Sequence, residues 1–195
     1  MSAFTWPPER WPRGQLPDDG AEVIPAAVLV PLYEAGGEPH LVLTRRRSDL
    51  RRHAGEISFP GGRRDEEDAD LAETALREAE EEIGLPREQA SLLGELPPTS
   101  TFATGYVIHP FVARVPAGLK WLPSAREVDA VLELSLAQVR SSSTRTVIKR
   151  RGFTFETDAY IVGDDVIWGA TARIIEHLLE RLALGLPGAP ALSGP

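Results

Sequence analysis

Three glutamates in the first half of the chain, Glu78, Glu81 and Glu82, have the residue type and the spacing for metal-assisted chemistry. On a helix, positions i, i+3 and i+4 lie on one side, so the three carboxylates converge on one patch. Between Asp65 and Glu82 there are ten carboxylates and a single base, Arg77. A solvated helix face is the ordinary explanation of an acidic run, but such a face carries scattered lysines, and this segment has none.

The repulsion among these carboxylates requires a counter-charge. Like charges at helical spacing destabilise a helix by about a few tenths of a kcal/mol per pair, and the helix dipole adds to the repulsion near the C-terminus. Mg²⁺ and Mn²⁺ prefer oxygen ligands and relieve it. Gly61 and Gly62 lie just upstream, where glycine lets the backbone approach a ligand closely. We therefore predict a Mg²⁺ or Mn²⁺ site that a main-chain carbonyl can join, although an ordinary turn also explains two glycines.

The glutamates can act together only if a helix spans about residues 71–83. Asp70 is a good N-cap for this helix, and Gly84 closes it. Its apolar residues fall on one side, which must face the core: Ala72, Leu76, Ala79 and Ile83.

Short apolar segments on either side of this helix indicate β-strands. They cover residues 26–32, 40–44, 57–59, 92–96, 106–115, 128–134, 146–149, 153–161 and 166–168. Apolar residues at helical spacing predict a second helix over 170–184. Strands interrupted by two helices predict an α/β or α+β sandwich with a mixed sheet. We expect an extended N-terminal arm over 1–22, a single domain over 23–185 and a flexible tail over 186–195.

Composition narrows the class of protein. The 195 residues carry a net charge of −8, which argues against binding to nucleic acid or to an anionic membrane. There is no cysteine, so disulfides and thiolate metal sites are excluded. The sequence shows no apolar run of membrane-spanning length and no secretory signal, so we expect a cytoplasmic protein with a small-molecule partner. The exposed arm and the late helix leave a homodimer open.

Residues 62–85 resemble the Nudix box, the signature of hydrolases of nucleoside diphosphates linked to another moiety. The run Arg77-Glu78-Ala79-Glu80-Glu81-Glu82-Ile83-Gly84-Leu85 matches the second half of the box at every defined position. The first half departs from the pattern. The usual spacing would place a glycine at Arg63 and a glutamate at Ala69, and the nearest acid here is Asp68.

Other segments are similar to the coenzyme A pyrophosphatase branch of this family. They are Leu43-Thr44-Arg45-Arg46, Arg51-Arg52-His53-Ala54-Gly55, Phe59-Pro60-Gly61-Gly62 and Ile167-Trp168-Gly169-Ala170-Thr171-Ala172-Arg173. The longer first half of the box also occurs in that branch.

This resemblance implies an α/β/α Nudix fold, a need for Mg²⁺ or Mn²⁺, and the hydrolysis of coenzyme A to 3′,5′-ADP and 4′-phosphopantetheine. It implies that Glu78 and Glu82 are the principal metal ligands and that Glu81 supports them, with the Gly62 carbonyl completing the shell. Some Nudix enzymes use a further glutamate from a loop before a late strand. Glu127 occupies that place as a fourth ligand or base, although a solvated loop acid explains it equally well.

Basic residues before the glycines suit an anionic substrate, because the arginine fork binds phosphate. Alternation along a strand sends Arg45 and Arg46 to opposite sides, and some of the basic residues simply balance the acidic helix. Arg46 and Arg51 coincide with the basic positions of the branch motif. We also expect Arg45, Gly61 and His53, the one histidine near the predicted site, to contact the substrate.

Three alternatives remain open from the sequence. The first is a Nudix hydrolase acting on ADP-ribose or a dinucleotide, since the box specifies the chemistry and not the leaving group. The second is a ligand-sensing Nudix domain without turnover, although such domains often lose the glutamates that are present here. The third is a metal-buffering acidic module, which would need neither the glycines nor the arginines.

Overall fold

A computed structural model describes residues 24–50, 53–101, 105–150 and 152–185. Its centre is an eight-stranded mixed sheet in which β1 and β7 are parallel and the other pairs are antiparallel. The strands of this sheet are β1 (Ile24–Ala35), β2 (Glu38–Arg46), β3 (Ile57–Ser58), β4 (Gly61–Arg63), β5 (Ser91–Glu95), β6 (Thr99–Ser100), β7 (Tyr106–Arg114) and β8 (Val128–Ser135). The main path runs β3-β2-β1-β7-β5, with β4 beside β1, β6 beside β7 and β8 beside β2.

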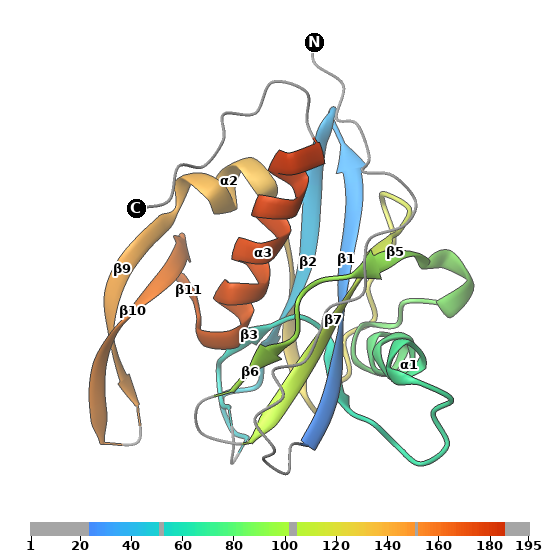
Figure 1. Ribbon diagram of the computed structural model, residues 1–195, viewed down its shortest axis with the longest axis horizontal. Helices are drawn as coiled ribbons and strands as arrows, with labels where there is room; N and C mark the ends of the chain where they lie inside the picture. The colour runs from blue at the N-terminus through green and yellow to red at the C-terminus, as the bar shows by residue number, and fades with distance from the viewer. Residues whose placement is uncertain (1–23, 51–52, 102–104, 151, 186–195) are drawn as a thin grey trace.

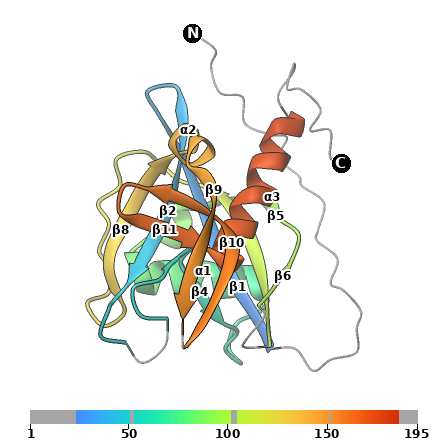
Figure 2. The same ribbon diagram turned by 90° about the vertical axis from the view of Figure 1, so that its left-hand side faces the viewer.

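Helices and a smaller sheet cover the two faces (Figure 1). One face is covered by α1 (Leu71–Ile83), and the other by α3 (Gly169–Gly185) and α2 (Leu136–Ser141). The small antiparallel sheet, in the order β11-β10-β9, lies on the side of α3 (Figure 2). Its strands are β9 (Ser143–Arg150), β10 (Phe153–Val162) and β11 (Asp165–Trp168), and a single 3₁₀ turn, η1 (Arg87–Gln89), follows α1. The predicted α+β sandwich with a mixed sheet is confirmed.

Strand β1 is apolar at nearly every position because both of its faces are covered. Val28, Val30 and Leu32 belong to the core under α3, whereas Ala27 and Leu29 belong to the core under α1. The continuous apolar run in the sequence therefore marks the middle layer of three.

Helix α1 has the predicted bounds and caps. The Asp70 side chain accepts a hydrogen bond from the Glu73 N–H at 2.9 Å, and Gly84 ends the helix with a positive φ of 68°. Its buried side differs from the expected one. Ala75, Ala79 and Ile83 are fully buried, whereas Ala72 and Leu76 lie at the margin. This rotation turns the Glu82 side of the helix toward the sheet.

Four short elements of the described chain have no counterpart in the prediction: α2, β4, β6 and η1. Each has six residues or fewer, too few for a periodic pattern to register. The predicted arm over 1–22 and tail over 186–195 lie outside the described residues. Within the described part, no helix is long and apolar enough to cross a membrane.

Candidate active site

Two glycines bring strand β4 against the acidic helix. Gly61 and Gly62 pair with Val28 and Ala27 of β1. A Cβ on Gly61 would overlap the Ala27 carbonyl oxygen, and a Cβ on Gly62 would lie 2.5 Å from Oε1 of Glu78. The position of Gly61 therefore requires glycine, because its neighbours are backbone atoms of β1. At Gly62 the neighbour is the end of the Glu78 side chain, so glycine there lets the Glu78 carboxylate lie directly over the β4 backbone.

On the sheet side of α1, the Glu78 carboxylate is partly buried and the Glu82 carboxylate is buried. Their side chains are 17% and 7% exposed. Burial raises the pKa of Glu82 to about 8, and the charges of Glu78 and Glu127 add to the rise. The nearby Arg46 and a hydrogen bond from the Gly61 backbone oppose it. Burial also raises the pKa of Glu78, against the effect of Arg77. The ionised forms of these two acids need a partner of high positive charge.

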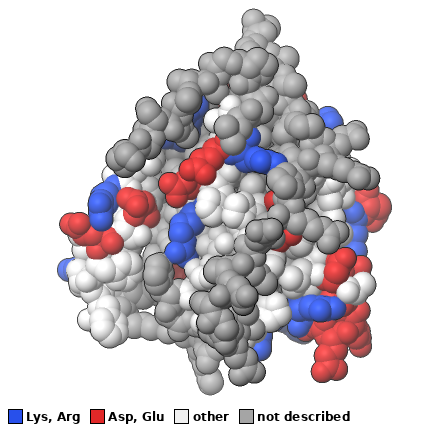
Figure 3. Space-filling model, in the orientation of Figure 1, with Lys and Arg blue, Asp and Glu red and all other residues white. Residues whose placement is uncertain are grey.

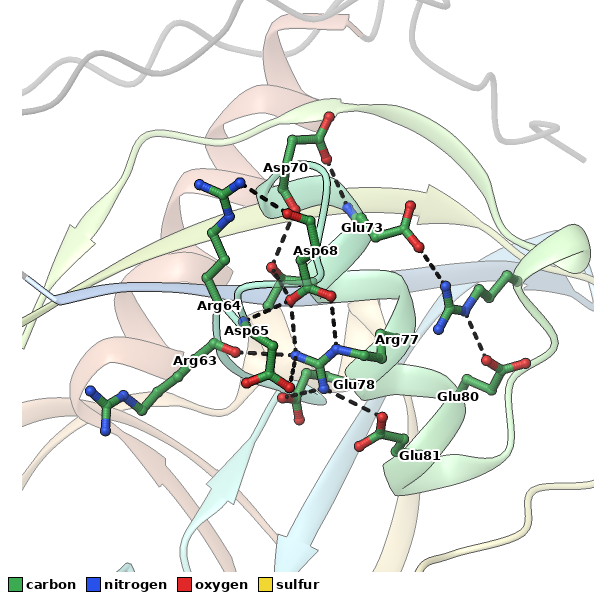
Figure 4. Close-up of polar contacts among 12 residues, drawn as sticks. Arg63, Arg64, Asp65, Asp68, Asp70, Glu73, Arg77, Glu78, Glu80 and Glu81 are labelled. Atoms are coloured by element: carbon green, nitrogen blue, oxygen red, sulfur yellow. Dashed lines mark hydrogen bonds and ion pairs between the residues drawn. The ribbon is translucent and has the colours of Figure 1, made fainter.

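Arg77 holds one side of this site rigidly (Figure 4). Its Nε and Nη2 donate to the two carboxylate oxygens of the buried Asp68 at 2.9 and 3.0 Å. Its Nη1 donates to Glu78 at 3.0 Å and to Glu81 at 3.4 Å, and Nη2 also donates to the Arg63 carbonyl oxygen at 3.2 Å. The guanidinium thus joins the helix to the loop before it and to β4.

Asp68 is the acid nearest to the position where the box pattern expects a glutamate, and it is the one that reaches Arg77. It also accepts hydrogen bonds from the Thr74 hydroxyl at 2.8 Å and the Asp65 N–H at 2.9 Å. The Arg77 hydrogen bond holds the pKa of Asp68 well below its usual range. Asp68 is therefore ionised and fixed in place, so the longer first half of the box still fastens Arg77.

Arg46 lies on the other side of Glu78 and Glu82. Its Nη1 is 3.7 Å from Oε1 of Glu82, and its Nη2 is 3.6 Å from Oε2 of Glu127. The fold thus brings Glu127 to the site from the segment before β8, with a side chain that is 52% exposed. Arg46 and Glu127, far apart in the sequence, face each other at the entrance to Glu82.

Glu81 differs from the other two glutamates of the helix. Its side chain is 60% exposed and contacts Arg77, so it lies at the outer edge of the site (Figure 4). In the described part of the chain, no three acidic or histidine side chains stand close enough together to hold a metal ion as they are. The positive charges beside Glu78, Glu81 and Glu82 are those of Arg77 and Arg46.

The donor set nevertheless fits a hard divalent cation. Glu78 and Glu82 offer carboxylate oxygens that are largely shielded from water and one helical turn apart, and Gly62 keeps the adjacent backbone free of a Cβ. Oxygen donors in this number suit Mg²⁺ and Mn²⁺. On the space-filling surface, acidic side chains gather at the lower right, around α1 and the loop before it (Figure 3). The ligand roles of Glu78, Glu81, Glu82 and the Gly62 carbonyl remain predictions.

Arg45 lies on the opposite face of the large sheet from Arg46. Its Nη2 donates to Asp165 of β11 at 2.6 Å, and its Nη1 is 3.8 Å from Asp129. It lines a cavity of about 470 Å³ together with loop residues 54–57 and 164–166 and the Trp168 ring. Its predicted contact with substrate therefore requires a substrate that extends into this cavity.

His53 stands at the rim of the same loop. It has a positive φ of 56°, and its Nδ1 lies 2.5 Å from Oε2 of Glu56. Arg51, the other basic residue expected to meet substrate, lies outside the described residues.

Sequence reasoning did not identify Asp165, Asp129 or Trp168 as neighbours of the arginines. Asp165 is 120 residues from Arg45, and nothing local distinguishes it from other turn acids. The pairing of β2 with β8 also shifts register between Arg45 and Arg46. This irregularity in the pairing with β8 lets Glu127 meet one arginine and Asp129 the other.

The arrangement of a glycine-supported acidic helix on a mixed sheet agrees with comparisons to known proteins. Residues 23–154 match the NUDIX domain family. A relative named Nudix hydrolase NudL, from Yersinia pestis (strain Pestoides F), is 39% identical over 161 residues, which cover 82% of this chain and 80% of the relative. The chain therefore belongs to the NUDIX family of hydrolases.

Solved structures share the fold. The NUDIX domain of Shewanella oneidensis NrtR, crystallised with ADP ribose, superimposes with a TM-score of 0.55 at 16% identity, covering 83% of this chain and 90% of that one. A MutT/nudix family protein from Enterococcus faecalis gives a TM-score of 0.56 at 15% identity, covering 85% of this chain and 64% of that one. At these identities the likeness concerns the fold alone.

Proposed function

We propose that this protein is a Mg²⁺- or Mn²⁺-dependent pyrophosphatase that hydrolyses coenzyme A to 3′,5′-ADP and 4′-phosphopantetheine. Membership of the NUDIX family supports the chemistry. The resemblance of residues 43–62 and 167–173 to the coenzyme A pyrophosphatase branch supports the substrate.

One contact carries the substrate proposal. The Thr171 hydroxyl donates to the Ile57 carbonyl oxygen at 3.1 Å, across 114 residues of sequence. Thr171 lies in the last segment that resembles the branch, and Ile57 lies between two of the earlier ones, so this contact holds those parts of the chain together. Trp168 and residues 54–57 line one cavity. Segments that are separate in sequence but share a cavity beside β2 are expected to act on one ligand, and that ligand must be long enough to extend from the pyrophosphate site.

The residues of the site have distinct parts in the proposed reaction. Glu78 and Glu82 would hold a divalent cation, with Glu81 in support. When bound, the cation would supply charge neutralisation of the pyrophosphate and activation of water. Glu127, half exposed beside Arg46, accepts the proton of the attacking water. The water oxygen bonds to one phosphorus, and the bridging oxygen leaves with the other, which yields the two phosphomonoesters.

A substrate panel tests this proposal. The protein is incubated with Mg²⁺ or Mn²⁺ and with coenzyme A, dephospho-coenzyme A, ADP-ribose or NADH, and the products are identified by mass. We expect 3′,5′-ADP and 4′-phosphopantetheine from coenzyme A, and no products when EDTA replaces the metal. Preferential cleavage of ADP-ribose or NADH would replace the substrate, and turnover of none of the four would remove the enzymatic proposal.

A further inference from the structure

Two neighbouring arginines on β2 are held in different ways. The Arg45 guanidinium donates to Asp165 at 2.6 Å, within a normal hydrogen bond. The Arg46 guanidinium lies 3.7 Å from Glu82 and 3.6 Å from Glu127, beyond hydrogen-bond length to both. Arg46 therefore neutralises two carboxylates by its charge without being fixed to either of them.

The buried part of Arg46 is also incompletely satisfied. Its Nε is buried and has no hydrogen-bond partner within the described part of the chain. Buried donors in a settled structure are nearly always paired. The position of Arg46 is therefore one that a better acceptor can change, in contrast to Arg77, whose Nε donates to Asp68 at 2.9 Å.

A divalent cation at Glu82 would compete with Arg46 for the same carboxylate. The two positive charges repel at short range, so the guanidinium must move when the cation enters. A pyrophosphate bound to that cation offers two oxygens to the arginine fork, which is the pairing that guanidinium groups favour. Cation and substrate would each remove an obstacle to the other.

We propose that Arg46 is an exchangeable counter-ion, held between Glu82 and Glu127 before the cation binds and transferred to the pyrophosphate of the substrate afterwards. This inference rests on the proposed metal-dependent hydrolysis but not on the identity of the leaving group. Arg46 thereby couples the binding of the cation to the binding of the substrate: the cation binds weakly without substrate and tightly with it. By linkage, the substrate gains from the cation by the same factor. The transfer also frees Glu127 to take a proton.

Mn²⁺ binding in the absence of substrate tests the first half of the proposal. Titration followed by electron paramagnetic resonance of free Mn²⁺, at about pH 8.5 so that carboxylates are largely ionised, compares the wild type with R46Q and R46K. We expect R46Q to bind Mn²⁺ about tenfold more tightly, because one positive charge beside the divalent ion is removed. R46K keeps the charge and should stay within about twofold of the wild type.

The matched control is R45Q, which removes the same charge one residue away on the opposite face of the sheet. Its Mn²⁺ affinity should remain within about twofold of the wild type, because a distant charge is screened. Thermal unfolding of each variant checks that it is folded. Equal or weaker Mn²⁺ binding by R46Q, or an equal gain in R45Q, would overturn the inference.

Steady-state kinetics tests the second half, using whichever substrate of the panel the wild type hydrolyses. At saturating Mn²⁺, R46Q should raise KM about tenfold, the effect of losing a charge-assisted bond to phosphate, with a smaller change in kcat. An unchanged KM would contradict the transfer to substrate. A wild type that binds no Mn²⁺ would instead remove the proposed function, so the two failures are distinguishable.

Discussion

Two clusters supply positive charge to the site, and they are held together in different ways: the Arg77 cluster, with Asp68 and Glu78, and the Arg46 cluster, with Glu82 and Glu127. Arg77 is enclosed by hydrogen bonds to Asp68, Glu78 and the Arg63 backbone, with lengths of 2.9 to 3.2 Å. Arg46 approaches Glu82 and Glu127 only to 3.7 and 3.6 Å. Arg77 supplies positive charge to Asp68 and Glu78, whereas Arg46 supplies it to Glu82 and Glu127, and only the contacts of Arg77 have hydrogen-bond length. The Arg77 cluster is therefore fixed by hydrogen bonds, whereas the Arg46 cluster is held together by charge alone.

The largest expected effect is on catalysis at Glu82, the acid between the two clusters. E82Q should lower kcat by about a thousandfold, the scale of losing one charge-stabilising group. Its free energy of unfolding should not fall, because the glutamine replaces a buried carboxyl whose ionisation is already disfavoured, with a pKa raised to about 8. Steady-state kinetics and urea unfolding measure the two quantities. Normal turnover in E82Q would refute its role.

The second prediction compares how much each cluster contributes to the free energy of unfolding. Asp68 and Arg77 form a buried, doubly hydrogen-bonded pair, so D68A should lower the free energy of unfolding by about 3 kcal/mol. R46Q should change it by less than about 1 kcal/mol, because its longer contacts contribute little. Urea denaturation of both variants gives the comparison. Equal losses would mean that Arg46 is as firmly fastened as Arg77.

The third prediction concerns the strand that supports Glu78. In G62A the new Cβ would lie 2.5 Å from Oε1 of Glu78, so the carboxylate must shift. We expect kcat to fall about tenfold, since small displacements of positioned groups reduce catalysis, while the fold is retained. Kinetics with circular dichroism checks this. A G62A enzyme with wild-type kcat would show that Glu78 tolerates displacement.

The last prediction is a pH dependence of the free energy of unfolding in EDTA, to which Glu82 and Asp68 contribute with opposite signs. The pKa of Glu82 is raised to about 8, so its contribution is present at pH below its unfolded pKa and is lost as pH rises through about 8. The pKa of Asp68 is lowered, so its contribution is present above its unfolded pKa and is lost as pH falls.

The free energy of unfolding in EDTA, measured by urea denaturation, should therefore be lower at about pH 8 than at about pH 5, and E82Q should reduce this difference. D68A should reduce the loss below about pH 4 instead. The same pH profile in all three proteins would show that neither carboxyl controls it.

Much of the fold follows from local pattern. Helix α1 begins and ends where Asp70 and Gly84 predict, and the strands β1, β2 and β7 cover the expected apolar segments. The short β4 was not expected, because three residues beginning with Gly61-Gly62 carry no alternation. Its existence depends on pairing with Ala26, Ala27 and Val28, which only the folded chain provides.

The candidate site divides in the same way. Glu78 and Glu82 were predicted from helical spacing, and the structure places both at the sheet side of α1. The sequence did not predict that Glu78 and Glu82 are less exposed than Glu81, because this depends on which side of the helix faces the sheet, and that side carries Ala75 and Ala79. The meeting of Arg46 with Glu127 depends on a register shift in β8 that no local pattern marks.

By itself, the sequence determined the helix and the convergence of its acids, because spacing along a helix converts directly into proximity, and the resemblance of residues 62–85 to the Nudix box indicated the class of chemistry. Only the tertiary structure decided which arginine holds which carboxylate, and how firmly. The contacts of Arg77 with Asp68 and of Arg45 with Asp165 join residues 9 and 120 positions apart. The lengths of such contacts depend on strand register, helix rotation and burial, which belong to the packed chain as a whole.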